Sequence, residues 1–297
     1  MRVVHQECEQ QNVKFIKLKY SIPSSASEKK DLLGMYGDYV FDWAGYADDL
    51  ILAFDDKTSM DKGLQIINKV FKRFKLAINA SKTKTMIFNF AEPPEQYPTS
   101  IAKLDGEMIE NVKTFQYLGS QIKFDQPTTG DTELTSRIDM AENKFHEHGK
   151  KLLNHKIKLS TRMVILNALV RSRLTYGCQT WTLNSRQTDR MNSAYTTMLR
   201  KMVRGGYQRK ENERGYKMTN KDLIDLCKTE CIQSFTLRQK KQYLAHGIRL
   251  PDHSIVKRTV FNADVTARPG RQTTYIKSAL AGSNLQQFAQ DALMKRI

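Results

Sequence analysis

"GYADDLILAF", residues 45–54, places two adjacent carboxylates, Asp48 and Asp49, inside a run that otherwise has the composition of a buried strand. Moving an unpaired carboxylate out of water costs several kcal/mol, so the pair needs compensation unless it stays at the surface. The β-rich arms of residues 39–54 flank a glycine-containing bend, which predicts a hairpin with both carboxylates at or near its turn. Two readings are open: a pair of solvent-exposed turn residues, or two oxygen ligands for a divalent cation such as Mg²⁺.

The segments around this hairpin predict a small sheet with helical cover. Residues up to about 22 read as a helix end and a short strand, and residues 82–90 and 114–122 read as further strands. Asp105-Gly106 lies between two mixed arms and is a strong short-range hairpin signal. An amphipathic helix is predicted to start at Thr58, and its apolar face is predicted to pack on the sheet. That face consists of Met60, Leu64, Ile67, Phe71 and Phe74.

Beyond residue 126 the apolar periodicity is helical. A first stripe consists of Leu134, Ile138, Ala141, Phe145 and Leu152, and a later one of Met191, Tyr195, Met198 and Met202. Ser160 is predicted to cap the helix between them, and Gly205-Gly206 to end the later helix. From residue 206 onward the chain is polar, basic and weakly periodic, with one helix expected around residues 223–246.

The charge balance restricts the class of partner. Lys and Arg outnumber Asp and Glu by 48 to 31 in 297 residues, a formal charge of +17 that points to nucleic acid or an anionic membrane. No apolar run approaches the roughly 18 residues of a membrane span, and the N-terminus lacks the apolar core of a signal peptide. Four scattered cysteines make no disulfide framework. We expect an intracellular protein of the nucleus or cytoplasm, not secreted and without a membrane partner.

A zinc site is not expected. Cys227 and Cys231 with His246 and His253 invite that reading, but six residues separate the two histidines where zinc sites usually have three to five. The two cysteines are one helical turn apart, so two small buried residues on an apolar face explain them equally well. The tryptophans, at 43 and 181, are expected to be packing residues.

Several motifs in the same order resemble the reverse transcriptases of LINE-type retrotransposons, which lack long terminal repeats. The first is YADD with apolar flanks, residues 46–49, which resembles the active-site hairpin of that family. Residues 76–88, with Asn79 and then Lys82 and Lys84, resemble its palm segment, and residues 115–122 its primer-grip strand. Residues 174–183, 198–204 and 243–249 resemble its thumb and post-thumb signatures, closest to the RTE-like group. A single short motif would be weak, whereas several in order are strong.

The resemblance implies an RNA-directed DNA polymerase with Mg²⁺, or alternatively Mn²⁺, as cofactor. Asp48 and Asp49 would be catalytic residues and metal ligands, and Lys82 would lie near the phosphates of the incoming nucleotide, where a cation assists phosphoryl transfer. Partners would be an RNA template and DNA primer, or an RNA–DNA duplex, and deoxynucleotide triphosphates. The hairpin and primer-grip contacts to nucleic acid would come from Tyr46, Tyr117, Leu118 and Gly119.

The expected fold class is α+β, a partial right-hand polymerase palm followed by an α-helical thumb and a basic C-terminal region. Residues 1–36 would be a remnant of a mid-palm helix and its connection, 37–126 the partial palm, 127–205 the thumb and 206–297 the post-thumb region. The family carries a further catalytic aspartate upstream of YADD, and no acidic residue before Asp48 lies in a comparable apolar strand. Asp42 is about 20 Å away along an extended strand. We therefore expect a truncated reverse transcriptase that is inactive as this chain alone.

Two alternatives to an enzyme remain. One is a non-catalytic nucleic-acid-binding protein derived from a retrotransposon, and the other is a fragment whose unpaired strand edges make it aggregate. Basic density supports nucleic-acid contact, because residues 144–173 hold eight Lys or Arg and one acid. The residues expected to contact nucleic acid there are Lys150, Lys151, Lys158, Arg162, Arg171 and Arg173. A second basic run spans residues 200–217, and the alternative for both runs is a solvated helix face.

Overall fold

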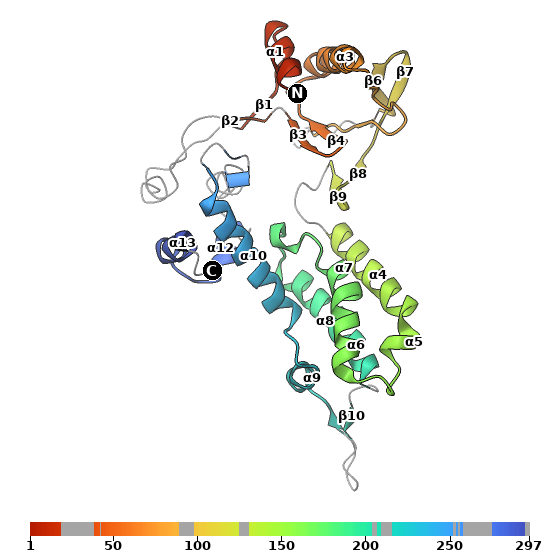
Figure 1. Ribbon diagram of the computed structural model, residues 1–297, viewed down its shortest axis with the longest axis vertical. Coiled ribbons are helices and arrows are strands. Elements are labelled where there is room, and N and C mark those ends of the chain that lie inside the picture. Colours follow the sequence, from red (N-terminus) through yellow and green to blue (C-terminus); the bar gives the residue numbers. More distant parts are fainter. Residues whose placement is uncertain are drawn as a thin grey trace. The chain divides into compact units, whose positions relative to one another are not determined.

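The computed structural model describes residues 1–18, 39–41, 43–88, 98–124, 131–203, 207–208, 216–251, 254, 256–257 and 275–294. The chain divides into two compact units, Met1–Pro127 and Thr128–Ile297. The first unit combines short, mostly antiparallel strands with helices and the second is largely helical (Figure 1). The predicted α+β class is confirmed, with small sheets followed by a helical region.

The described part of the first unit is built from short strands and helices. The helices described there are α1 (Arg2–Gln10) and α3 (Lys57–Arg73). Its strands are β1 (Ile16–Leu18), β2 (Tyr39–Phe41), β3 (Trp43–Tyr46), β4 (Asp49–Leu52), β5 (Lys84–Thr85), β6 (Ser100–Leu104), β7 (Glu107–Asn111), β8 (Thr114–Tyr117) and β9 (Ser120–Lys123). The pairs β1–β2, β3–β4 and β8–β9 are antiparallel ribbons, and β5, β7 and β6 form a three-stranded sheet with β5 parallel to β7. The strand expected over residues 82–90 is thus two residues long among the described 82–88.

Helix α3 contributes to two apolar clusters among the described residues of this unit. In Figure 1 it lies between α1 and the β6–β7 pair. Ile67 and Val70 pack with α1, while Leu64 packs with strands β6 and β7. The predicted amphipathic helix is confirmed, with two differences. Its N-cap is Asp56, whose side chain accepts a hydrogen bond from the Ser59 backbone at 2.7 Å, so Thr58 is not the cap. Phe74 follows the last turn and is 64% exposed, outside the buried face.

Glycine at position 63 lets α3 approach the segment after β4. A Cβ built on Gly63 would lie 2.4 Å from the Phe54 ring, a distance that packed atoms do not tolerate. Phe54 in turn stacks on Phe15 with ring centroids 5.4 Å apart. We expect Gly63→Ala to lower the free energy of unfolding of this unit by about 1 to 2 kcal/mol, because overpacking exceeds the gain in helix propensity. Hydrogen exchange of the full chain, followed by mass spectrometry, reads each unit separately.

Gly149→Ala is the matched control for this steric effect. Only the tip of the Leu153 side chain, at 4.0 Å, would meet the added methyl group, so no loss of stability is expected. Equal protection of α3 amides in the Gly63→Ala protein and the parent would contradict the close approach of Phe54.

Two further hairpins in this unit have two-residue turns. Asp105 and Gly106 have φ of 51° and 88°, the left-handed pair of a type I′ turn, which confirms the hairpin predicted there. The Asp105 carboxylate accepts hydrogen bonds from Asn68 at 2.8 Å and Lys72 at 2.7 Å. Both bonds lower the pKa of Asp105, and the bond from Lys72 has the larger effect.

Residues 114–122 are not one strand, because the chain reverses at Leu118, where φ is 47°.

The second unit has a helical core. Its elements are α4 (Asp131–Glu147), α5 (Gly149–Leu152), α6 (Leu159–Ile165), the π-helix η2 (Leu166–Arg171), α7 (Ser172–Leu174), the 3₁₀-helix η3 (Cys178–Thr180), α8 (Ser185–Met202), β10 (Tyr207–Gln208), β11 (Tyr216–Lys217), α9 (Asn220–Cys227), α10 (Ile232–Arg249), α12 (Tyr275–Leu280) and α13 (Leu285–Leu293). The two predicted stripes are confirmed as parts of one buried cluster, although Leu152 of the first stripe lies on α5 and not on α4. Figure 1 shows α12 and α13 beside α10.

Three sequence expectations for this unit need correction. Helix α6 begins at Leu159, with Lys158 and not Ser160 at the N-cap. The single helix expected over residues 223–246 is two helices, because Lys228 adopts a left-handed φ of 48° that ends α9. The expected stop at residues 205–206 lies outside the described residues, and the C-cap of α8 is Val203.

The two cysteines considered for zinc do not share a helical face. Cys227 is buried at the end of α9, and Cys231 is the N-cap of α10. Trp181 is 3% exposed within the core, so its predicted packing role is confirmed. Trp43 is 37% exposed and contributes less packing than expected. Leu223, Cys227 and Ile232 belong to the same cluster as α4 and α8, so the core is continuous across residue 206.

Candidate active-site hairpin and basic surface

The two adjacent aspartates lie at the tip of the β3–β4 hairpin. Tyr46 pairs with Asp49, which leaves Ala47 and Asp48 as a two-residue loop. Ala47 has a φ of 53°, uncommon for a residue with a Cβ, and Asp48 has no positive φ. A positive φ at the first loop position alone is the sign pattern of a type II′ turn. The predicted hairpin, with its carboxylates at the turn, is therefore confirmed.

The pleat of the hairpin separates its polar tip from the core. Leu52 packs against the cluster formed by α1 and α3. Asp49 lies three positions earlier, so it lies on the opposite face of the strand, together with its cross-strand partner Tyr46. Asp48, Asp49 and Tyr46 are all exposed, Tyr46 at 67%. The carboxylates therefore point away from the apolar cluster that supports the hairpin.

The base of the hairpin is fixed to the start of the chain. Phe15 forms a β-bridge with Phe54, and the Ile16 backbone donates a hydrogen bond to the Ala53 carbonyl at 3.3 Å. The Lys14 backbone donates to the Ser59 hydroxyl at 3.0 Å. A loop held in this way by main-chain bonds and a stacked aromatic pair positions its side chains more accurately than a free turn.

The hairpin tip supplies some of the ligands that a divalent cation needs. Two exposed carboxylates supply the hard oxygen ligands that Mg²⁺ prefers. Among the described residues, no three His, Cys, Asp or Glu side chains gather into a group that could hold a metal ion. Asp48 and Asp49 therefore fit two positions of a magnesium site, and water or other groups would fill the remaining ones.

Lys82 lies in a tight turn organised by Asn79. The Asn79 side chain accepts a hydrogen bond from the Lys82 backbone at 3.1 Å, and the Asn79 carbonyl accepts one from the Thr83 backbone at 2.9 Å. Lys84 pairs with Glu110 at 2.7 Å, which ties this turn to β7. The Lys82 side chain is exposed, and no hydrogen bond or ion pair joins it to the two aspartates within the described part of the chain.

Tyr117, Leu118 and Gly119 form the tip of the β8–β9 hairpin. Leu118 and Gly119 are its two loop residues, with φ of 47° and 80°. Leu118 is 40% exposed and Tyr117 is half-buried. The predicted primer-grip residues are thus a turn and its flank, presented at the surface of the first unit.

The basic residues predicted to contact nucleic acid differ in how far they are exposed. Lys150, Lys151, Lys158 and Arg173 are exposed on the second unit. Arg171 is half-buried, with its guanidinium 4.6 Å from the Phe235 ring centroid.

Arg162 differs from these residues, because it is 5% exposed. Its guanidinium donates to the carbonyls of Ile157, Leu152 and Met202 at 3.1, 3.1 and 2.7 Å. These bonds make Arg162 an internal structural residue, and we remove it from the proposed nucleic-acid surface.

The sequence did not predict one group of residues on the second unit, formed by Tyr176, Arg137 and Glu133. Tyr176 is 49% exposed, and the guanidinium carbon of Arg137 lies 4.6 Å from its ring centroid. Arg137 pairs with Glu133 at 2.7 Å, although both side chains are almost fully buried. The available signal was a Glu and an Arg four residues apart, each next to the apolar stripe of residues 134–145.

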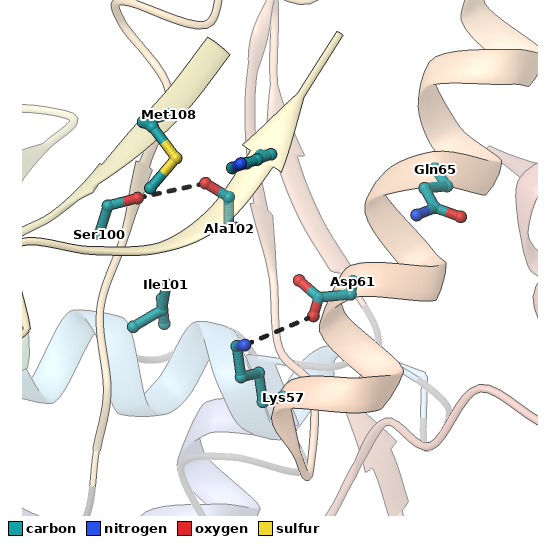
Figure 2. Close-up of a pocket in the computed structure, with 8 residues that line it drawn as sticks. Lys57, Asp61, Gln65, Ser100, Ile101, Ala102 and Met108 are labelled. Atoms are coloured by element: carbon teal, nitrogen blue, oxygen red, sulfur yellow. Dashed lines mark hydrogen bonds and ion pairs between the residues drawn. The ribbon is translucent and has the colours of Figure 1, made fainter. Parts of the chain in front are cut away.

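A separate hollow of about 400 Å³ lies between α3 and the edge of β6. Figure 2 shows Lys57, Asp61 and Gln65 along one side of α3, with Lys57 and Asp61 3.9 Å apart. Ser100 and Ala102 face them from β6. None of the predicted site residues lines this hollow.

Comparison with known proteins connects the hairpin with a family. Residues 30–122 match the model of the reverse transcriptase (RNA-dependent DNA polymerase) family. A transposon-derived protein of Caenorhabditis elegans is 26% identical over 162 residues, which are 53% of this chain and 55% of that protein. The chain thus spans about half the length of the curated relative that it matches. No solved structure matches the chain. Among the described helices, none is long and apolar enough to cross a membrane. Residues 30–122 are therefore similar to part of a reverse transcriptase domain, in a chain with distant similarity to a transposon-derived protein.

Proposed function

We propose that this chain carries the active-site hairpin and thumb of a LINE-type reverse transcriptase, whose complete form performs metal-dependent nucleotidyl transfer. The observation that carries the proposal is the pair Asp48 and Asp49 at a two-residue turn, inside the segment that matches the reverse transcriptase family. Residues 37–126 would belong to the palm, 127–205 to the thumb, and 206–297 to a basic region that continues the helical core.

Some residues of the two hairpins would bind the metal ion, and others would contact the primer and template. Asp48 and Asp49 would hold Mg²⁺, or Mn²⁺, which supplies stabilisation of the attacking 3′ oxygen and of the leaving pyrophosphate. Lys82 would place a positive charge near the nucleotide phosphates, where charge develops during transfer. Tyr46 and the tip at Leu118 would contact the primer strand and its RNA template.

We propose that this chain by itself does not extend a primer. Mg²⁺ dehydrates reluctantly and binds weakly unless several well-placed ligands share it. Asp48 and Asp49 are exposed, and the described residues add no third side chain to them. Activity would return when a palm segment that bears the further aspartate is supplied by fusion or in trans.

Primer extension on an RNA template tests both statements. We expect no incorporation of deoxynucleotides by the full chain with Mg²⁺ or Mn²⁺, and measurable incorporation once the complementing palm segment is added. In the complemented protein Asp48→Ala should lower the rate at least about a thousandfold, because a metal ligand is lost. Asp55→Ala is the matched control, because Asp55 is also exposed and lies outside the turn.

Two outcomes would contradict these expectations in different ways. Incorporation by the chain alone that disappears in Asp48→Ala would show that the chain is active and that the site is correct. Equal rates for Asp48→Ala and Asp55→Ala in the complemented protein would remove the assigned site.

A second candidate function is nucleic-acid binding without catalysis. The net charge of +17 and the exposed cations Lys150, Lys151, Lys158 and Arg173 favour it. Binding of an RNA–DNA duplex should then weaken steeply with salt, because neutralised phosphates release counterions. An affinity unchanged by Asp48→Ala, together with no complemented activity, would favour this function over the first.

A further inference from the structure

The arrangement at Tyr176 combines an exposed ring with a buried charge. The Tyr176 side chain is 49% exposed, while Arg137, whose guanidinium carbon lies 4.6 Å from the ring centroid, is 3% exposed. A guanidinium at this distance over an aromatic face makes a cation–π contact. One face of the ring is thus supported from inside the unit, and the ring still reaches solvent.

The support under the ring is held by a second buried charge. Glu133 accepts a hydrogen bond from Arg137 Nε at 2.7 Å, and the side chains are 7% and 4% exposed. Both residues lie on α4, four positions apart, so the helix itself sets their geometry. A buried ion pair is a weak source of stability, because desolvation offsets its attraction. The hydrogen bond from Nε to Glu133 orients the guanidinium, whose carbon lies 4.6 Å from the Tyr176 ring centroid.

The backbone on both sides of Tyr176 is anchored. Leu174 and Cys178 are buried in the core, and Thr175 donates hydrogen bonds to the Arg171 carbonyl from its backbone at 2.9 Å and its hydroxyl at 2.8 Å. Gly177 has a φ of 74°, a left-handed conformation that glycine adopts without strain, and it is the N-cap of η3. Tyr176 therefore stands at a fixed corner between α7 and η3.

We propose that Tyr176 is a stacking platform for an unpaired nucleobase of RNA or DNA. A rigid aromatic ring that is half-exposed offers stacking area at little cost in conformational entropy. The positive charge beneath it withdraws electron density and favours an electron-rich purine on the exposed side. Arg173, exposed three positions earlier, supplies attraction for the neighbouring phosphate. The proposal rests on the nucleic-acid binding proposed above and adds Tyr176, which lies in the thumb-like stretch 174–183 but was not among the residues predicted to contact nucleic acid.

The experiment uses the full chain and a short single-stranded oligonucleotide, as RNA or as DNA, that contains one 2-aminopurine. Stacking on the platform should quench 2-aminopurine fluorescence. Tyr176→Leu is expected to weaken binding about tenfold and to abolish the quench, because the aromatic face is lost. Tyr176→Phe keeps that face and should bind within about twofold of the parent. The dependence of affinity on salt should be unchanged in both variants, because no phosphate contact is lost.

Leu226→Ala is the matched control for a general effect on the second unit. Leu226 is 48% exposed on α9, and its truncation should leave both affinity and quench unchanged. Melting curves of all variants show whether the fold is retained. Binding by the parent with equal affinity and quench in Tyr176→Leu and Tyr176→Phe would overturn the platform alone. Absence of any salt-dependent binding by the parent would overturn the nucleic-acid function and the platform with it.

Discussion

Arg162→Met is expected to lower the free energy of unfolding of the second unit by about 3 to 5 kcal/mol. Arg162 is 5% exposed, and its guanidinium bonds to the last carbonyls of two helices, Leu152 of α5 and Met202 of α8. Helix C-termini leave such carbonyls without intrahelical partners and carry partial negative charge. Methionine fills similar space but donates no hydrogen bond, so the carbonyls would be buried and unsatisfied. Urea denaturation and hydrogen exchange in the last turn of α8 measure the effect.

Lys158→Met is the control for loss of a positive charge near the same helix. Lys158 is exposed at the N-cap of α6, so we expect a change within about 0.5 kcal/mol. Equal stability of the two variants would show that Arg162 contributes as a surface charge, which would restore it to the nucleic-acid surface.

The structural features that could be predicted from the sequence are those set by residues close together along the chain. Asp105-Gly106 forms the expected turn, because both residues tolerate left-handed conformations. The β3–β4 hairpin was predictable from a different local signal, the apolar arms on either side of Asp48 and Asp49. The stripes on α4 and α8 followed from a period near 3.6 residues.

The missed features depend on distant contacts or on residues that act against their usual preference. Arg162 lies in a basic run, and its burial depends on Met202, forty positions later along the chain. Lys228 ends α9 in a left-handed conformation that glycine usually adopts, so no sequence signal separated α9 from α10. The pairing of Tyr176 with Arg137 joins the turn between α7 and η3 to helix α4, which no short motif can reveal.

The ion pair beneath Tyr176 should show strong non-additivity. Arg137→Met alone is expected to cost about 3 to 5 kcal/mol, because it leaves the Glu133 carboxylate buried without its charged partner. Glu133→Leu alone should cost a similar amount for the opposite reason. The double variant Glu133→Leu, Arg137→Met replaces both charges by apolar side chains of similar volume, and we expect it to unfold within about 1 kcal/mol of the parent. Urea denaturation of the four proteins gives the coupling energy.

The exposed pair on the same helix provides the matched control. Lys144 and Glu147 are 2.6 Å apart with 36% and 54% of their side chains exposed, so Lys144→Met should change stability by less than about 0.5 kcal/mol. If the double variant at 133 and 137 is as unstable as either single variant, the pair contributes to folding itself and needs no further role. If it is stable but binds a 2-aminopurine strand as weakly as Tyr176→Leu, then the two buried charges serve to hold the ring.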